Sequence, residues 1–363
     1  MSESITRRTF VYGLASSFAG GPIFRGSNLF AEDFSIAEIA PFRTPYKYGK
    51  LVLAASNESG TFDSKSVDDP FVFLHEGVFH MLYIGFDGTG YQTGLARSTD
   101  LVNWERVACV AHRDPNSNYT RYNIALSCLL REDGLTSKGK LKKINGRYLG
   151  AWNAYPNAGY EAGAAVIGLA WSSDLLHWEL TDPILFPKDG AQWEHGGLYR
   201  PNLVEKNGVC FLYYNAKTDT MPKSKGGGWH EQSGVATSRD LKQWVRYAGN
   251  PILRNGGPGS WDARFASNPF VVQYKKLWGM YYFGLDSHGI ARELLALGRD
   301  PYHFEKVNEI MIDRGAPGTV DEDYAHKPCV IFHNGALYHF YCAVSGKWPH
   351  DVRGISVARS KPW

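Results

Sequence analysis

The sequence lacks an apolar stretch of the roughly 18 residues that a membrane-spanning helix needs. Its N-terminal apolar run, residues 11–19, ends at Gly20-Gly21-Pro22. It also lacks a concentration of charge of one sign, because 39 basic and 36 acidic residues leave a formal net charge of +3. Nucleic acids and anionic membranes bind strongly positive surfaces. We therefore expect no nucleic-acid partner and no stable membrane insertion, and the oligomeric state stays open.

Cysteine is scarce as well. The five cysteines are scattered, their number is odd and none forms a C-x-x-C pair. A disulfide framework or a zinc site would need a regular spacing. We expect no cofactor, although a central structural cation stays open. Buried free thiols are expected at Cys109, Cys128, Cys210, Cys329 and Cys342.

The first residues have the pattern of a twin-arginine export signal. Arg7-Arg8 precedes the apolar run, and small residues lead on to Ala31. The alternative is an exposed N-terminal helix with a chance pair of arginines. We expect residues 1–31 to be an export signal with an approximate cleavage site, 32–47 to be a linker, and the mature protein to be periplasmic or extracellular.

Glycine and aromatic residues are abundant, with 39 glycines and 14% aromatic residues, which is typical of many short strands and tight turns. An internal repeat organises them. The tract 94–104, Gly-x-Ala-x-Ser-x-Asp-Leu-x-x-Trp, recurs at 168–178 and 234–244, less well at 295–304, and in truncated form at 354–360. In four of the units an acidic residue also precedes a proline by seven residues: Asp63, Glu194, Asp262 and Asp321.

A repeat of about 60 residues with four antiparallel strands per unit predicts the blades of a propeller. Five repeat starts predict an all-β, five-bladed β-propeller over residues 48–363. The last unit ends after its third strand. We therefore expect residues 51–54 to close the ring by pairing with the strand around 354–358, which also removes an exposed sheet edge.

The Ser-x-Asp-Leu-x-x-Trp tract occurs in nearly every unit, whereas an active site needs a particular residue once. We therefore interpret the tract as a structural turn. Its serine and aspartate can hydrogen-bond the turn backbone. The tryptophans, Trp104, Trp178 and Trp244, are expected to be buried between blades.

The residues just before each proline differ from unit to unit. These pairs are Asp68-Asp69, Tyr199-Arg200, Ser267-Asn268 and His326-Lys327. The inner strands of a propeller start at one mouth of the central channel, so these side chains are expected to converge on a site there. The alternative is that they are ordinary turn residues at strand starts.

These motifs resemble the five-bladed propeller glycosidases, such as glycoside hydrolase families 32, 43, 117 and 130. The resemblance covers residues 48–363 and implies that Asp69, beside Pro70, is a base or nucleophile. Those enzymes usually carry a second central aspartate. This sequence departs from them there, because Arg200, Asn268 and Lys327 occupy the matching positions.

Glycoside cleavage needs one carboxylic acid and one ionised carboxylate. The catalytic candidates are Asp69, Glu194, Asp262 and His326. The substrate-binding candidates are Asp68, Trp152, Asn153, Arg200, Asn215, Lys217, Asn268, Asp286 and Lys327. Loops between second and third strands add sugar-contacting residue types, among them Tyr155, Tyr160-Glu161, Trp229-His230-Glu231, Lys223, Lys225 and Trp348.

The function expected from the sequence is an exported glycoside hydrolase acting on a poly- or oligosaccharide. One alternative is a glycoside phosphorylase, because Arg200, Lys327 and His326 could hold inorganic phosphate. The other is a propeller that binds carbohydrate without cleaving it, since fold does not fix function. The missing second aspartate favours that last alternative.

Overall fold

The computed structural model describes residues 34–159, 161–218, 228–347 and 350–363. The predicted export signal and the rim residues Tyr160, Lys223, Lys225 and Trp348 therefore lie outside the described residues. No helix in the described ranges is long and apolar enough to cross a membrane. The five cysteines are free thiols, as predicted, and all but the half-buried Cys109 are buried.

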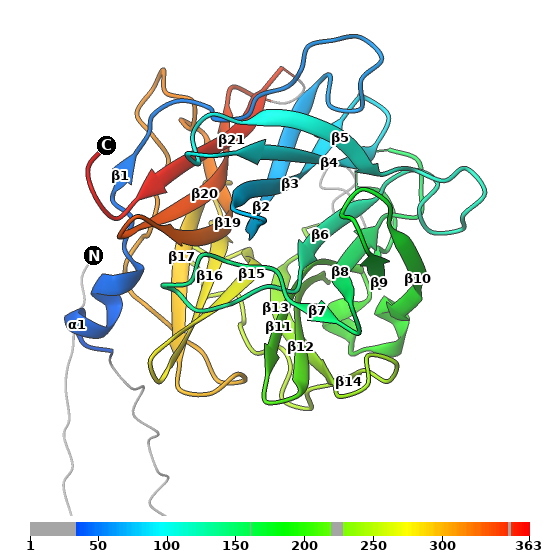
Figure 1. Ribbon diagram of the computed structural model, residues 1–363. Helices are drawn as coiled ribbons and strands as arrows, with labels where there is room; N and C mark the ends of the chain where they lie inside the picture. The colour runs from blue at the N-terminus through cyan, green and yellow to red at the C-terminus, as the bar shows by residue number, and fades with distance from the viewer. Residues whose placement is uncertain (1–33, 160, 219–227, 348–349) are drawn as a thin grey trace, which may run out of the picture. The chain divides into compact units, whose positions relative to one another are not determined.

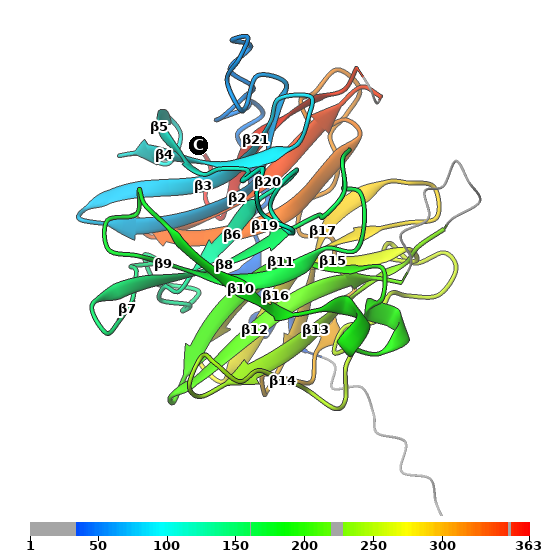
Figure 2. The same cartoon turned by 90° about the vertical axis from the view of Figure 1, so that its right-hand side faces the viewer.

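The described strands form five blades, which confirms the five-bladed propeller (Figures 1 and 2). Blade I contains β2 (Ser66–His75), β3 (Val78–Phe86), β4 (Tyr91–Ser98) and β5 (Glu105–Ala111). Blade II contains β6 (Ala125–Leu129), β7 (Lys143–Ile144), β8 (Arg147–Ala154), β9 (Val166–Ser172) and β10 (Glu179–Leu185). Blade III contains β11 (Gly197–Lys206), β12 (Val209–Lys217), β13 (Glu231–Ser238) and β14 (Val245–Arg246). Blade IV contains β15 (Phe265–Tyr274), β16 (Leu277–Leu285), β17 (Ala291–Gly298) and β18 (Glu305–Lys306). Blade V contains β19 (Tyr324–His333), β20 (Ala336–Ser345), β21 (Val352–Arg359) and β1 (Tyr46–Lys47).

The N-terminal segment closes the ring, as predicted. Leu53 forms a bridge with Ile355, and Lys47 of β1 pairs with Ala358 of β21. The described part of the predicted linker at 32–47 contains α1 (Ile36–Ile39), the 3-10 turn Ala40–Phe42 and β1, and it contacts blade IV through Phe42 and blade V through β1. Phe42 is fully buried, and its carbonyl accepts a 2.7 Å hydrogen bond from the Tyr281 hydroxyl.

The recurring acid before each proline ties together the strands of its own blade. In blade III, Glu194 accepts a 2.8 Å hydrogen bond from the Tyr214 hydroxyl and a 2.7 Å ion pair from Arg246. The same arrangement recurs, with the tyrosine on the second strand and the cation on the fourth: Asp63–Tyr83–Arg106, Asp262–Tyr282–Lys306 and Asp321–Tyr341–Lys47. Lys47 therefore gives β1 the role of a fourth strand.

Lys47→Met is expected to lower the free energy of unfolding by about 2 kcal/mol, because the buried Asp321 carboxylate loses its cation while the lysine itself is partly exposed. Lys50→Met, at an exposed neighbouring position, is the control and should leave stability unchanged. Urea unfolding of the three proteins measures the difference. Equal loss in both variants would show that the ring does not depend on this ion pair.

The Ser-x-Asp-Leu turn is structural, as predicted. The Ser98 hydroxyl accepts the Leu101 backbone N–H at 2.9 Å, and Asp100 accepts two further backbone N–H groups. The turn tryptophans are half-buried, which corrects the prediction that they are buried between blades, although they do pack on the main core. The ring of Trp104 in blade I lies edge-on to Phe340 of blade V, with 5.8 Å between the ring centroids.

Trp104→Ala is expected to destabilise the fold by about 2–3 kcal/mol, slightly less than a fully buried tryptophan would cost. Activity per folded molecule should not change, because this residue does not line the cavity described below. Thermal unfolding and an activity assay on the same preparation check both statements. Wild-type stability combined with lost activity would place Trp104 in the functional site instead.

A segment of blade II, residues 130–142, contacts the inner strands of three other blades. Its backbone hydrogen-bonds to Leu74 of blade I, Gln273 of blade IV and Phe332 of blade V. The buried Arg131 donates to the carbonyls of Val72 and Val330. This segment therefore lies at the ends of the inner strands, opposite to the strand starts.

Candidate active site at the upper mouth of the channel

In four of the five blades, a bulge in the inner strand turns the residue before the proline away from the regular strand path. In blades I, III, IV and V the strand register shifts just at the proline. The preceding residue has a left-handed backbone, with φ of 62° at Asp69, 49° at Arg200, 54° at Asn268 and 67° at Lys327. Such strain costs about 1–3 kcal/mol at a non-glycine residue and is typical of functional sites. Blade II has no proline here, and none of its inner-strand residues has a positive φ.

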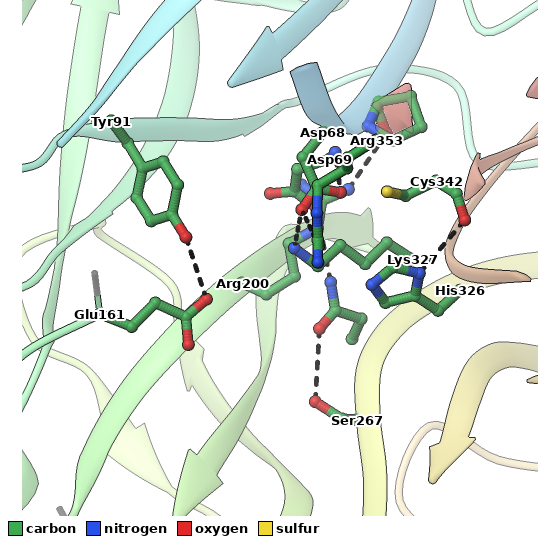
Figure 3. A network of polar contacts seen from close by, with 12 residues as sticks. Asp68, Asp69, Tyr91, Glu161, Arg200, Ser267, His326, Lys327, Cys342 and Arg353 are labelled. Carbon is green, nitrogen blue, oxygen red and sulfur yellow. Dashed lines mark hydrogen bonds and ion pairs between the residues drawn. The ribbon is translucent and has the colours of Figure 1, made fainter. Parts of the chain in front are cut away.

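Asp69 and Arg200 form the floor of the site (Figure 3). Arg200 Nε lies 2.6 Å from Asp69 Oδ1, and the other two nitrogens donate to the carbonyls of Ser127 and Pro70 at 2.6 and 3.1 Å. Asn268 donates to the same Asp69 oxygen at 3.4 Å. Burial raises the pKa of Asp69, against the opposing effects of Arg200 and Lys327.

Asp68 lies beside this floor and is neutralised by two cations. Lys327 Nζ is 2.5 Å and Arg353 Nη1 is 3.1 Å from Asp68 Oδ2. Burial acts to raise the pKa of Asp68, but the two cations hold it well below its usual range. Asp68 also approaches His326 and Cys342, which makes the three a geometric candidate for a metal site. They do not suit a divalent cation, because two positive side chains already lie on the one carboxylate.

His326 is buried, and burial lowers its pKa to about 3, so its imidazole is neutral near pH 7. Its Nδ1 lies 3.1 Å from the Cys342 carbonyl oxygen. Since a carbonyl only accepts hydrogen bonds, the proton of the neutral ring belongs on Nδ1. His326 is therefore poorly suited to deliver a proton to a leaving group.

A cavity of about 230 Å³ opens above this floor. Among the described residues, three carboxylates line it: Asp69, Glu161 and Glu231. Glu161, from the loop between β8 and β9, accepts an ion pair from Lys217 at 3.0 Å and a hydrogen bond from the Tyr91 hydroxyl at 3.4 Å. Figure 3 shows Glu161 and Tyr91 to one side of the charged floor.

Glu231, the first residue of β13, accepts hydrogen bonds from the Trp229 indole at 2.9 Å and the Ser267 hydroxyl at 2.7 Å. The ammonium of Lys217 lies between the two glutamates, over the rings of Tyr155, Tyr199 and Trp229 at 4.9, 4.8 and 5.2 Å. Its side chain is only 5% exposed. Lys217 is thus fixed behind the cavity wall by aromatic faces and one carboxylate.

The two glutamates have opposite protonation tendencies. Burial raises the pKa of Glu231, and the nearby Lys217 offsets this only in part. Burial also acts on Glu161, but the charges of Lys217 and Lys327 outweigh it and lower the pKa. One carboxyl group that favours its acid form and one that favours its ionised form therefore share a cavity, which is the arrangement that acid–base catalysis requires.

Comparison with known proteins agrees with this interpretation. Residues 139–312 match the family model described as the glycosyl hydrolases family 32 N-terminal domain. A solved structure described as a complex of BT0996 and RGII is 28% identical, with a TM-score of 0.75, over 90% of this chain and 94% of that one. The chain is similar to glycosidases with a five-bladed propeller fold. A structure described as a glycoside hydrolase is 25% identical, with a TM-score of 0.76, over 91% of this chain and 97% of that one.

An uncharacterised protein of Mycobacterium tuberculosis, MT1551, is 25% identical over 194 residues, which are 51% of this chain. The match spans 60% of the length of that relative.

Several of the site residues predicted from the sequence lie at the cavity. Those that line it are Asp69, Asn153, Arg200, Asn268, His326 and Lys327. Asp68, Asn215 and Lys217 lie behind the wall and contact lining residues.

Four further predicted site residues do not line the cavity and are engaged in structural contacts elsewhere. Glu194 and Asp262 hold their own blades together through a tyrosine and a cation. Trp152 is buried in the core, with its indole bonded to the Leu169 carbonyl at 2.8 Å. Asp286 accepts backbone N–H groups of its own turn and an ion pair from Arg292.

Sequence reasoning placed Glu161 and Glu231 only among sugar-contacting loop residues. Both lie outside the repeated motifs, so the repeat could not supply their register. Their sequence neighbourhoods, Tyr160-Glu161 and Trp229-His230-Glu231, place each acid near an aromatic residue, but only the fold shows that both acids reach one cavity.

Proposed function

We propose that this protein is a glycoside hydrolase that cleaves a poly- or oligosaccharide in this cavity. Glu231 is the general acid that protonates the leaving oxygen, and Glu161 is the ionised carboxylate that attacks the sugar or activates water. The observation that carries the proposal is a pair of carboxyl groups on one cavity whose environments move their pKa values in opposite directions.

Asp69 has a different role in this proposal. Its oxygen Oδ1 contacts Arg200 and Asn268, and the remaining nitrogens of Arg200 donate hydrogen bonds to two backbone carbonyls. Asp69 is therefore proposed to bind a sugar hydroxyl rather than to attack carbon. That Asp69 is the essential carboxylate, as the resemblance implied, stays a prediction that the variants below also test.

Phosphorolysis is the less favoured chemistry. A phosphate site needs donors that are available to the anion. Arg200 already contacts Asp69 and two carbonyls, Lys327 contacts Asp68, and His326 is neutral. We also propose that the protein is exported, on the basis of Arg7-Arg8 and the apolar run that follows.

The test is a screen of aryl glycosides and plant and algal oligosaccharides with the wild type and a Glu161→Gln/Glu231→Gln double variant, with and without phosphate. Hydrolysis by the wild type and its loss in a folded double variant are expected. Product that forms only with phosphate would replace the proposal by phosphorolysis. Binding of a saccharide without turnover would replace it by a carbohydrate-binding propeller.

A further inference from the structure

One wall of the cavity is apolar and separate from the main core of the propeller. Its six residues contact one another as a distinct cluster, and each of them also lines the cavity. They come from the start of blade IV, its second and third strands, the loop before β13 and the start of β19: Trp229, Phe265, Phe283, Leu285, Ala291 and Tyr324. A cluster that contacts the cavity throughout, and not the core between blades, is best explained by contact with a ligand.

The wall offers little to a hydroxyl group apart from the hydroxyl of Tyr324. Its backbone is engaged in the sheet, since Leu285 pairs with both Phe265 and Ala291. The Trp229 indole N–H is already donated to Glu231. The charged and polar lining residues come mostly from blades I, II, III and V, among them Asp69, Asn153, Glu161, Arg200, Lys327 and Arg353, with Asn268 from blade IV. A second apolar cluster also lines the cavity, but three of its residues, Tyr91, Tyr155 and Tyr199, carry hydroxyl groups.

A sugar bound between Glu161 and Glu231 would present one side to this wall. A hydroxymethyl group there would bury its hydroxyl without a partner, whereas a methyl group would gain apolar contact. The volume of about 230 Å³ lies below the range of drug-sized ligand sites and fits a single sugar residue.

We propose that the sugar held in the cavity is a 6-deoxyhexose, whose methyl group packs against the wall formed by Phe265, Phe283, Leu285 and Ala291. The inference rests on the proposed function for the identity of the site as a glycosidase cavity. It adds a substrate class, glycosides of 6-deoxy sugars, and names the residues that select it.

The test compares aryl glycosides in pairs that differ only at carbon 6, such as rhamnoside with mannoside and fucoside with galactoside of the same configuration and anomer. We expect kcat/KM of the 6-deoxy member to be about 10- to 100-fold higher, the range within which an apolar pocket discriminates such groups. Equal rates, or a preference for the hydroxymethyl member, would overturn the proposal.

Leu285→Gln adds an amide to the wall at similar volume and is expected to reduce that preference to about threefold or less. Phe283→Tyr makes a smaller change with the same expected direction, in case the first variant does not fold. Leu180→Gln, the same substitution at an exposed position of β10, is the matched control and should keep the wild-type ratio. A ratio unchanged in both wall variants would remove the wall from specificity.

Binding of the free sugars separates this inference from the proposed function, because it needs no catalysis. Ligand-observed NMR with the full chain compares each 6-deoxyhexose with its hexose. Tighter binding of the 6-deoxy sugar without cleavage of any glycoside would reject the hydrolase function and support the proposed sugar class. Hydrolysis without any preference at carbon 6, in rate or in binding, would reject the sugar class and support the hydrolase function.

Discussion

Glu231→Gln is expected to lower kcat by about 10²- to 10⁴-fold on glycosides with poor leaving groups and much less on activated aryl glycosides. The reason is that a general acid matters only where the leaving oxygen needs a proton. In the wild type, burial raises the pKa of this carboxyl group, which favours its acid form, and Ser267 and Trp229 fix its position. A plot of log kcat against leaving-group pKa, for wild type and variant, measures the effect.

Glu161→Gln should lose activity on both kinds of substrate, because the ionised carboxylate acts whatever the leaving group. Glu105→Gln, at an exposed position paired with Arg97, is the control and should behave as wild type. A Glu231→Gln variant that loses the same factor on every leaving group would contradict its assignment as the acid.

Asp69→Asn distinguishes the two assignments of the essential carboxylate. If Asp69 binds a sugar hydroxyl, the variant should raise KM more than it lowers kcat. The interpretation drawn from the family resemblance expects instead a loss of about 10²- to 10⁴-fold in kcat with sugar affinity kept. Circular dichroism and a binding assay are needed alongside, because the variant also leaves Arg200 without its carboxylate.

The fold was predictable because most blades form the same turns and strand contacts with the same residue types. The turn serine and aspartate are two residues apart in each full copy of the tract, and the acid precedes the proline by seven residues in four units. Because these spacings within a unit are kept, one unit predicts the next. The ring closure was predictable for the same reason, from a fourth strand missing at the end. Lys47 was not recognised as the fourth-strand cation, because the clamp it completes joins residues 274 positions apart.

The site was predictable only in part. The bulge residues before each proline do converge on one cavity, as the repeat predicted. Glu194 and Asp262 were predicted as catalytic candidates because they are acids, but they recur because each binds a tyrosine and a cation of its own blade. Glu161 reaches the cavity from a loop and Glu231 from the first position of β13, directly after a loop, and loop paths depend on tertiary contacts such as those of Lys217.

Lys217→Met is expected to move the whole pH profile of kcat/KM to higher pH. The ammonium of Lys217 favours the ionised form of both glutamates, so its removal lets each hold its proton to higher pH. Glu161 must be ionised, so the acid limb moves up by about 1 to 3 pH units, the usual effect of an ion pair at this distance. Glu231 must be protonated, so the alkaline limb moves up as well, because Lys217 is the cross-strand neighbour of Glu231 and its charge lowers the pKa of that group.

Lys217→Arg keeps the charge among the aromatic rings and should restore the profile in large part, whereas Lys206→Met, at an exposed lysine bonded to Gln273, should not change it. Stability supplies a readout that needs no catalysis. Because the folded protein lowers the pKa of Glu161, its ionisation stabilises the wild type at neutral pH, and this contribution is lost as the pH falls through that pKa. Lys217→Met should therefore show a weaker dependence of unfolding free energy on pH below about pH 5. A pH profile that only loses height, with both limbs in place, would mean that Lys217 supports the cavity wall without setting the charge of either glutamate.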